Sequence, residues 1–565
     1  MDQKAKLRKL IVSTFALEGF TIQEKACAHL IQQLEPLECK EDRDQWLEKI
    51  IDYVRVSNTN DGNIVTYDLL NKSLKFCCDL QILNDEDILR VTPANKLPCY
   101  KYCSSTKKFL RITSDSKSLS MFGDASTKIA QYVNRYTVIR QRMTRIKTVT
   151  DGTLGQPLTI SDKIRDVDYL LSSGAAGKFD HNSKKSSVLL LGILVQLKEG
   201  GRYYLEDPTG AIPIDLSKTI SFENISEGCY CSDQRVFAVT DMALPPCERA
   251  EISKIYFGEA TTFCDDDHSL KLYNPKLLEY EKTKKRMIIF ICDVFLDDPK
   301  VLNKFHTFLN AFNEVIPVAI VMMGDFLSCH VPSHVYAQEL KFHLTQLGHY
   351  LHDNTPELKN TTFVLLPGPG DRYCGTASAS ILPRPPIPDS LTEEFRRLVP
   401  RCVFTTNPCR IQYCTQQLHV IRIDGLMKKT ANYDVRQGSV DRKKSTVAGI
   451  DKSAVQNYIQ TLESQSHLIT VPLDVCPTYW PLASHSLSLY PMPDLVCVAD
   501  ANAPEYSTSD DSSSRISSSS GCVFINPSSF ARNKYRFSVY LTAQRQVDDS
   551  QIPDDDEVEN NSLDV

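Results

Sequence analysis

Each of three short apolar runs in the middle of the chain ends close to an acidic residue. The runs and their acidic residues are Met287–Cys292 with Asp293, Ile316–Met323 with Asp325, and Thr362–Leu366 with Asp371. Short β-rich runs separated by helical segments predict βαβ units and a buried parallel sheet. Such folds place their chemistry at the carboxyl ends of the strands. Carboxylates gathered there are the residue type that a metal-dependent hydrolase needs.

The segments between these runs carry apolar residues at helical spacing. The residues that share a face are Leu302, Phe305, Leu309 and Phe312 in the first segment, and Leu340, Leu344 and Leu347 in the second. Both stripes predict helices that pack on the sheet and hold the strand ends in place.

The order of the strand-end motifs resembles that of the calcineurin-like metallophosphoesterases. Their blocks read Asp-x-His, Gly-Asp-x-x-Asp and Gly-Asn-His-Asp/Glu, followed by a lone His and a Gly-His-x-His. In this chain Phe295 stands in place of the first ligand His and Ser328 in place of the second-block Asp. Pro369 and Gly370 stand in place of the third-block Asn and the catalytic His, and no His-x-His occurs among the twelve histidines.

The two remaining acidic positions cannot make a two-metal hydrolase. Such a centre needs enough imidazole and carboxylate ligands for two cations and an acid for the leaving group. Asp293 and Asp325 are therefore vestigial metal positions, and we expect no catalytic residue, no metal and no other cofactor. The resemblance implies that the fold is retained while the hydrolase is inactive.

Further motifs resemble the B subunits of eukaryotic replicative DNA polymerases, and they are specific in combination. They are Val403–Gln416, Gln465–Leu468, Cys476–Trp480, Leu489–Leu495 and Phe524–Phe530, with Met121–Gly123, Arg135–Thr137 and Ile381–Pro386 favouring the epsilon branch. The resemblance implies a multidomain α/β chain. Its parts would be an N-terminal helical domain similar to the lid domain of AAA+ ATPases, an OB-fold β-barrel, and an inactive calcineurin-like phosphoesterase α/β sandwich at the C-terminus.

The expected domains follow from this resemblance and from local composition. They are a helical domain at 1–75, a connector at 76–160, the OB-fold at 161–284, the inactive phosphoesterase-like domain at 285–540 with a disordered Ser-rich loop at 501–520, and an acidic disordered tail at 541–565. The serine-rich and acidic stretches cannot bury enough apolar area to order themselves.

The N-terminal residues carry three apolar stripes of their own. The stripes are Leu7, Leu10, Ile11 and Phe15; Cys27, Leu30, Ile31 and Leu34; and Leu47, Ile50, Ile51 and Val54. Thr21–Glu24 has the pattern of a capping box that opens the second helix. No P-loop motif is present, so this module is not expected to bind nucleotide as a P-loop ATPase does.

The predicted OB-fold begins with the run Val188–Val195, which reads as a strand that bends or bulges at Gly192. The segment Leu205–Gly210 predicts a hairpin. Tyr203 and Tyr204 could stack single-stranded nucleic acid, but the positive groove that such binding requires is missing nearby. Protein contact is therefore favoured over a single-strand-binding module, although both remain open.

Composition narrows the class of protein. A length of 565 residues and 42% apolar residues allow roughly three or four domains with sizeable cores. The net charge of −6 disfavours a protein that grips a phosphate backbone over its whole surface. Nineteen cysteines without a Cys-x-x-Cys pair predict reduced, mostly buried thiols. The charged amino terminus and short apolar runs predict neither a signal peptide nor a membrane span.

The resemblance to polymerase B subunits implies a non-catalytic scaffold subunit in the nucleus. The resemblance implies that it binds the zinc-bearing C-terminal region of the polymerase epsilon catalytic subunit, assembles with the small histone-fold subunits, reaches GINS and the replicative helicase through its N-terminal domain, and contacts DNA mainly indirectly. A lost active site is a concave surface that a partner can use. Candidate partner anchors, by residue type, are Arg410, Tyr413, Tyr479 and Trp480, each of which could equally be buried. The alternatives are a B subunit of polymerase alpha or delta, or a residual metal-dependent phosphodiesterase.

Overall fold

The computed structural model divides the chain into two compact units, Met1–Ile88 and Leu89–Val565. The residues that it describes are 2–34, 47, 50–51, 54, 64–79, 88–112, 123–145, 164–175, 188–197, 201–217, 219, 227–231, 236–258, 275–373, 381–433, 452–508 and 517–553. Within these residues, no helix has the length and apolarity that a bilayer crossing requires.

The first unit is a small helical module with its own core. Its described elements are α1 (Asp2–Leu17), β1 (Thr21–Ile22), α2 (Glu24–Leu34), β2 (Ile64–Val65) and α4 (Tyr67–Asp79). Residues from all three predicted stripes, among them Phe15, Leu30 and Val54, are buried together in one cluster. The predicted capping box is wrong, because Thr21 lies in β1, where it pairs with Ile64, and α2 begins only at Glu24.

Two six-stranded sheets form the main body of the second unit. In spatial order, the first contains β16 (Cys402–Phe404), β15 (Thr362–Leu366), β14 (Ala319–Met323), β13 (Met287–Cys292), β22 (Arg536–Leu541) and β23 (Gln546–Gln551). The four strands from β16 to β13 are parallel, as the βαβ pattern predicts, and β22 and β23 extend the sheet in antiparallel fashion. Because parallel strands end on one edge, their carboxyl ends are brought together there.

The second sheet contributes the other half of the body. In spatial order it contains β20 (Tyr506–Ser507), β21 (Val523–Asn526), β19 (Leu495–Ala499), β18 (Gln416–Arg422), β17 (Cys409–Tyr413) and β3 (Leu89–Pro93). Strands β18, β19 and β21 run parallel to one another. The Sγ atom of Cys497 on β19 lies 3.8 Å from Sδ of Met323 on β14, so side chains of the two sheets meet between them.

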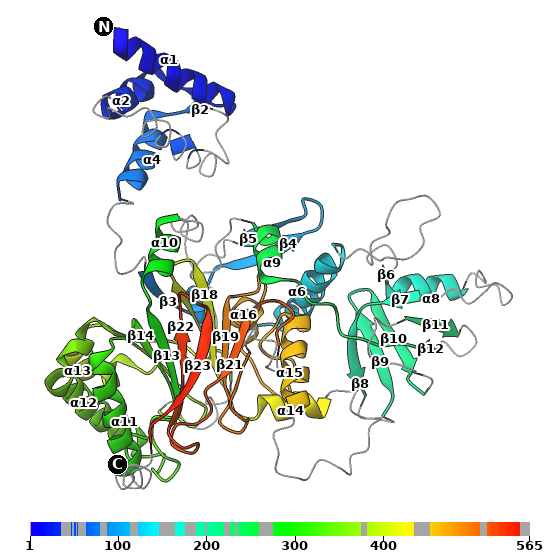
Figure 1. The fold of residues 1–565 in the computed structure, drawn as a ribbon. Helices are drawn as coiled ribbons and strands as arrows, with labels where there is room; N and C mark the ends of the chain where they lie inside the picture. The colour runs from blue at the N-terminus through cyan, green and yellow to red at the C-terminus, as the bar shows by residue number, and fades with distance from the viewer. Residues whose placement is uncertain are drawn as a thin grey trace, which may run out of the picture. The chain divides into compact units, whose positions relative to one another are not determined.

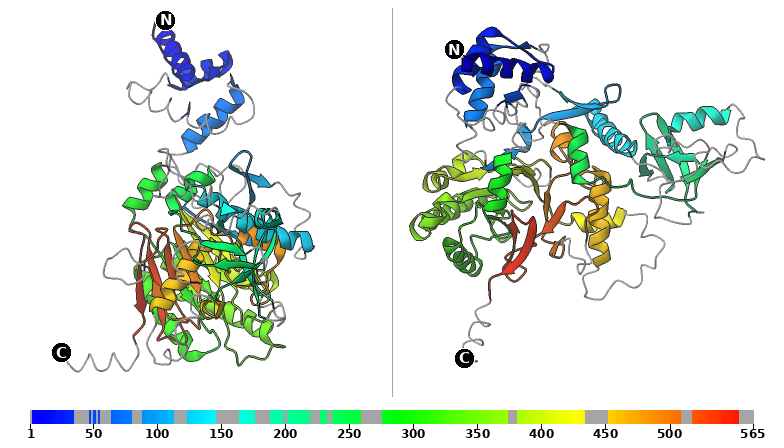
Figure 2. Two further views of the ribbon diagram at one scale, coloured as in Figure 1. Left: turned by 90° about the vertical axis from the view of Figure 1, so that its right-hand side faces the viewer. Right: turned by 45° about the horizontal axis from the view of Figure 1, so that its top comes forward.

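Helices cover the outer faces of both sheets (Figure 1 and Figure 2). The helices on the first sheet are α11 (Pro299–Glu314), α12 (Tyr336–Asn354) and α13 (Asp389–Leu398), and those beside the second are α14 (Leu426–Tyr433) and α15 (Lys452–Gln465). The predicted residues Phe305, Leu309, Leu340 and Leu344 pack in one core with the outward side chains of the first sheet. The body is thus an α/β sandwich of two sheets between two layers of helices.

A separate seven-stranded sheet follows α6 in the chain. It contains β6 (Ile164–Arg165), β7 (Val188–Leu190), β11 (Glu227–Cys231), β12 (Val236–Val239), β10 (Gly210–Asp215), β9 (Tyr203–Asp207) and β8 (Ile193–Gln196), with α8 (Val167–Ala175) against it. The predicted run divides at Gly192, where a Cβ would lie 2.7 Å from the Glu206 carbonyl oxygen. The predicted hairpin forms, with Gly210 paired to Asp207.

The remaining elements of the second unit connect its parts. They are the hairpin of β4 (Cys99–Cys103) and β5 (Lys108–Ile112), the helices α6 (Ala125–Met143), α9 (Ala250–Phe257), α10 (Pro275–Thr283) and α16 (Trp480–Ser486), and two short 3-10 helices, η1 (Ala94–Lys96) and η3 (Pro356–Asn360). Two arginines at the C-terminal end of α6 and just beyond it pair with acidic neighbours, Arg140 with Asp166 and Arg145 with Glu248.

Three expected boundaries differ from the structure. The expected connector is built into the body, because β3 pairs along β17, more than 300 positions away, and α6 packs on α16. In the expected Ser-rich loop, Ser518 and Ser520 donate hydrogen bonds to the Glu463 carboxylate, while residues 509–516 lie outside the described residues. The expected acidic tail contains β23, which pairs with β22, and residues 554–565 lie outside the described residues.

Candidate functional site

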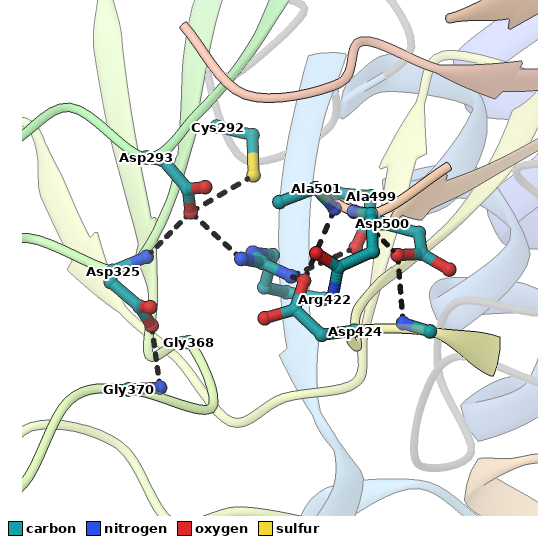
Figure 3. A network of polar contacts seen from close by, with 12 residues as sticks. Cys292, Asp293, Asp325, Gly368, Gly370, Arg422, Asp424, Ala499, Asp500 and Ala501 are labelled. Carbon is teal, nitrogen blue, oxygen red and sulfur yellow. Dashed lines mark hydrogen bonds and ion pairs between the residues drawn. The ribbon is translucent and has the colours of Figure 1, made fainter. Parts of the chain in front are cut away.

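Strand ends from both sheets meet at one place in the sandwich (Figure 3). Asp293 directly follows β13, and Asp325 follows β14 after Gly324. From the facing sheet, Arg422 is the last residue of β18. The two acidic positions singled out in the sequence are therefore brought together, and an arginine lies between them and the second sheet.

Arg422 and Asp293 form a completely buried ion pair. Nη2 of Arg422 lies 2.8 Å from Oδ1 of Asp293, and the two side chains are 0% and 1% exposed. The same guanidinium donates from Nε to the Gly324 carbonyl oxygen at 2.6 Å and from Nη1 to Asp424 Oδ1 at 2.5 Å. Asp293 Oδ1 also accepts a hydrogen bond from the Asp325 backbone N–H at 2.9 Å. The arginine thus ties the ends of three strands together.

The surroundings of Arg422 keep it charged. Burial disfavours the charged guanidinium, but Cys292, Asp293 and Asp424 together hold the pKa of Arg422 well above its ordinary value. Burial in turn raises the pKa of the Cys292 thiol well above its usual range. A buried pair of this kind is stable only when further hydrogen bonds satisfy both partners, and the Gly324 and Asp424 contacts supply them. Arg422 thus places a buried positive charge at this edge of the sheet.

Asp325 points away from that pair and into the loop after β15. Its Oδ1 accepts a hydrogen bond from the Gly370 N–H at 2.6 Å. A Cβ at Gly370 would lie 2.3 Å from Asp325 Oδ2, and one at Gly368 would lie 2.4 Å from Oδ1. The glycines therefore let the loop close over the carboxylate. Burial first, and then the neighbouring Asp371, raise the pKa of Asp325 to about 7.

The Asp371 carboxylate is held by hydrogen bonds from neighbouring residues of the chain. It is fully buried and accepts hydrogen bonds from the Phe326 N–H at 2.9 Å, the Tyr336 hydroxyl at 2.7 Å and the Gly368 N–H at 2.7 Å. Burial raises the pKa of this carboxyl as well. All of these contacts lie within the chain, so Asp371 fixes the loop rather than facing a ligand.

The residues at the expected ligand positions do not fit a two-metal centre. Phe295 packs in the hydrophobic core of the first sheet. Ser328 donates to the Asp297 carboxylate through its backbone N–H at 2.7 Å and its hydroxyl at 2.5 Å. Within the described ranges, no three His, Cys, Asp or Glu residues are grouped so as to hold a metal ion. One acceptor, Asp293 Oδ2, is buried without a hydrogen-bond partner among those residues, which is too little for a cation site.

Sequence reasoning missed the contribution of the second sheet. Besides Arg422, Asp424 accepts from the Ala501 N–H at 3.1 Å, and Asp500 accepts from the Gly425 and Asn502 N–H groups at 2.8 and 2.9 Å. The signal was available, because the runs that become β18 and β19 also end at charged residues. Only the strand ends of the first sheet had been singled out.

The four predicted partner anchors lie within the body. Arg410, Tyr413 and Tyr479 are buried, and Arg410 donates to the carbonyl oxygens of His485 and Ser488 at 2.6 and 3.3 Å. Trp480 is half-buried, with the Lys128 ammonium 5.4 Å from a ring centroid. The structure therefore gives Arg410, Tyr413 and Tyr479 packing roles, and Trp480 keeps some exposed surface.

Comparison with family models assigns all three parts of the chain. Residues 3–77 match a family described as DNA polymerases epsilon N terminal. Residues 125–246 match the OB-fold domain of DNA polymerase epsilon subunit 2-like proteins, which confirms the predicted OB-fold. Residues 288–508 match the family of DNA polymerase alpha/epsilon B subunits.

Curated relatives match along almost the whole length. DNA polymerase epsilon subunit 2 of Mus musculus is 32% identical over 97% of this chain and 99% of its own length. The Homo sapiens protein of the same name is 31% identical with the same coverage. The DNA polymerase epsilon B subunit of Saccharomyces cerevisiae is 24% identical over 83% of this chain and 76% of its own. A solved structure, TT1561 of Thermus thermophilus, covers 48% of this chain at 12% identity with a TM-score of 0.23, too low to support an argument.

Proposed function

The chain belongs to the family of DNA polymerase epsilon B subunits, and on that premise we propose that it is a non-catalytic scaffold of the polymerase epsilon complex in nuclear DNA replication. The observation that carries the proposal is the buried ion pair between Arg422 and Asp293. Where a hydrolase of the resembled fold would hold cations, this chain holds its own guanidinium. The same residues that could have served chemistry now join the two sheets.

The pair also explains how a strand-end site without a metal suits a scaffold. A metal-bound site needs open coordination positions for substrate and water, whereas Arg422 donates to acceptors on three strand ends and leaves no open position at Asp293 Oδ1. Asp325 is likewise covered by the loop at Gly370. A closed, rigid edge is suited to holding a partner in a fixed geometry.

We assign different partners to the two units. The second unit, with the OB-fold and the sandwich, would hold the zinc-bearing C-terminal region of the catalytic subunit, with the small histone-fold subunits in the same complex. The first unit, which has a core of its own, would reach GINS and the replicative helicase. The net charge of −6 supports contact with DNA mainly through these partners.

Two alternatives are disfavoured by particular observations. A B subunit of polymerase alpha or delta would not be expected to match the epsilon N-terminal family over residues 3–77. A residual phosphodiesterase would require ligands that Phe295 and Ser328 cannot provide.

The division of roles is tested by substituting one core residue of the first unit. Leu30 is completely buried in that core, so Leu30→Asp buries an unpaired charge and unfolds the module. Leu17 on α1 is 86% exposed, so Leu17→Asp is the matched control. The full-length variants are captured with the C-terminal region of the catalytic subunit and, separately, with GINS.

We expect Leu30→Asp to abolish capture by GINS while capture by the catalytic subunit stays at the wild-type level. Leu17→Asp should bind both unless the exposed leucine is itself a contact, in which case only GINS capture falls. Loss of the catalytic subunit with GINS retained would contradict the assignment. A wild-type chain that binds neither partner would contradict the scaffold role.

A further inference from the structure

A cavity of about 50 Å³ lies in the second unit, away from the strand-end site. Its walls come from the hairpin β4–β5, from α6, α9, α16 and β17, and from the segments that precede and follow α16. The pieces are distant in sequence, yet α6 packs on both β4 and α16, which fixes the walls relative to one another. A volume of this size holds roughly three or four water molecules or one small polyatomic ion.

The charge on the cavity wall is of one sign. Two arginines, Arg135 and Arg410, carry it, and two histidines that burial keeps neutral by lowering their pKa, His467 and His485, also line the cavity. Among the described lining residues none is an aspartate or a glutamate. Serine and amide side chains, including Ser484 and Asn134, add further hydrogen-bond donors.

Arg135 presents a guanidinium whose contact in the cavity is neutral. Its Nη2 donates to Oε1 of Gln465 at 2.8 Å, and no carboxylate in the described part of the chain forms an ion pair with it. Burial lowers the pKa of Arg135 to about 10, against which only the Tyr132 phenol acts. A charge held this way is costly until an anion compensates it.

The two histidines present unused ring nitrogens. His467 is buried, with Nδ1 2.7 Å from the Ile469 carbonyl oxygen, and its Nε2 has no hydrogen-bond partner among the described residues. His485 Nδ1 is likewise buried without a partner there. Buried polar atoms are nearly always satisfied in folded proteins, so two such atoms on one cavity indicate a missing ligand.

We propose that this cavity binds a phosphate group, carried by inorganic phosphate or by a mononucleotide, between Arg135, Arg410, His467 and His485. Phosphate has the size and charge that the site lacks, and its oxygens accept from several converging donors at once. The lining also includes the aromatic rings of Phe109 and Tyr490, at a centroid distance of 5.4 Å. The remainder of a nucleotide would lie outside a cavity of this size.

The test uses the purified full-length chain, with inorganic phosphate, deoxyadenosine monophosphate and acetate as separate probes at matched ionic strength. Binding is measured by titration calorimetry and by the melting temperature. We expect saturable one-site binding of phosphate and a rise of a few degrees in the melting temperature at saturation. Tighter binding of the mononucleotide would identify a nucleotide as the source, and equal binding would identify free phosphate.

Two variants locate the binding. Arg135→Gln should weaken phosphate affinity at least ~10-fold, the effect of losing a charge-assisted contact. Arg140→Gln, on the same helix but outside the cavity, should bind as wild type. If Arg135→Gln does not fold, His485→Gln replaces it, with a weaker loss expected. The proposal is overturned if neither phosphate nor the mononucleotide saturates, if acetate binds equally well, or if the folded cavity variant retains wild-type affinity.

Discussion

The second unit contains two buried clusters of charged residues, and the two clusters differ in how their arginines are paired. At the strand ends, Arg422 is surrounded by Asp293 and Asp424, and each guanidinium nitrogen has an acceptor from the chain. In the cavity beside α6, Arg135 has a neutral contact and two histidine nitrogens have none in the described residues. In the first cluster Arg422 is paired with carboxylates, and one acceptor, Asp293 Oδ2, has no partner among the described residues, whereas in the second cluster Arg135 forms no ion pair with a described carboxylate.

This difference separates a structural site from a binding site more sharply than residue type does. Both clusters contain charged residues that a motif search would mark as functional. The matched cluster lies at strand ends, where the resembled hydrolases hold cations, whereas the unmatched one is assembled from Arg135, Arg410 and His467 in separate segments of the chain. The property to test is therefore how fully each arginine is paired. It is measured by the free energy of unfolding that the protein loses when that arginine is replaced.

The largest effect is expected from paired substitutions of the two arginines. Arg422→Gln should lower the free energy of unfolding of the second unit by about 3–5 kcal/mol, because it leaves Asp293 buried and uncompensated. Arg135→Gln should change it by less than ~1 kcal/mol, since no carboxylate depends on it. Denaturant unfolding followed by Trp480 fluorescence in a Trp46→Phe background measures both.

A double-mutant cycle provides the control for that prediction. Asp293→Asn combined with Arg422→Gln should cost clearly less than the sum of the single changes, because the pair is removed together. Additive costs, or equal costs for the two arginine variants, would show that pairing does not distinguish the clusters.

A second effect depends on pH at Asp325. Its pKa in the fold is about 7, above the ordinary 3.8, so its contribution to stability is complete below pH ~4 and is lost as pH rises through ~7. Asp325→Asn removes this titration. Relative to the variant, the wild type should lose on the order of 2–4 kcal/mol between those pH values. Unfolding curves at several pH values measure the difference, and two parallel profiles would refute the burial of this carboxyl.

The smallest effect concerns the loop that covers Asp325. Gly370→Ala places a Cβ where Asp325 Oδ2 lies 2.3 Å away, and overpacking of this kind costs about 1–3 kcal/mol. At Gly210 a Cβ would meet its nearest side-chain atom at an ordinary 3.5 Å, so Gly210→Ala is the control. Thermal melts compare the two, and equal stability would indicate that the loop does not close on Asp325.

Local patterns predicted much of the sandwich. Strands β13 and β15 have the bounds of the apolar runs Met287–Cys292 and Thr362–Leu366, because continuous apolar runs in this context are buried on both faces. The helical stripes were equally clear, since Phe305 and Leu340 pack on the first sheet. Strand β3 was missed because it is a short edge strand whose only partner in the described residues, β17, lies far along the chain.

Only half of the strand-end site was predicted from the sequence. Asp293 and Asp325 were identified from the motif order, but the partner of Asp293 lies 129 positions away on the other sheet. An ion pair between distant residues leaves no local pattern. The cavity was missed for the same reason, since Arg135, Arg410 and His467 come from separate segments that only the fold brings together.

The proposal that Arg422 replaces a metal is tested most directly by a hydrolysis assay. The purified full-length chain is incubated with Mn²⁺ and bis(p-nitrophenyl) phosphate, beside Asp325→Ala. We expect both proteins to release nitrophenol no faster than buffer with Mn²⁺ alone. Mn²⁺-dependent hydrolysis by the wild type that disappears in Asp325→Ala would contradict the replacement.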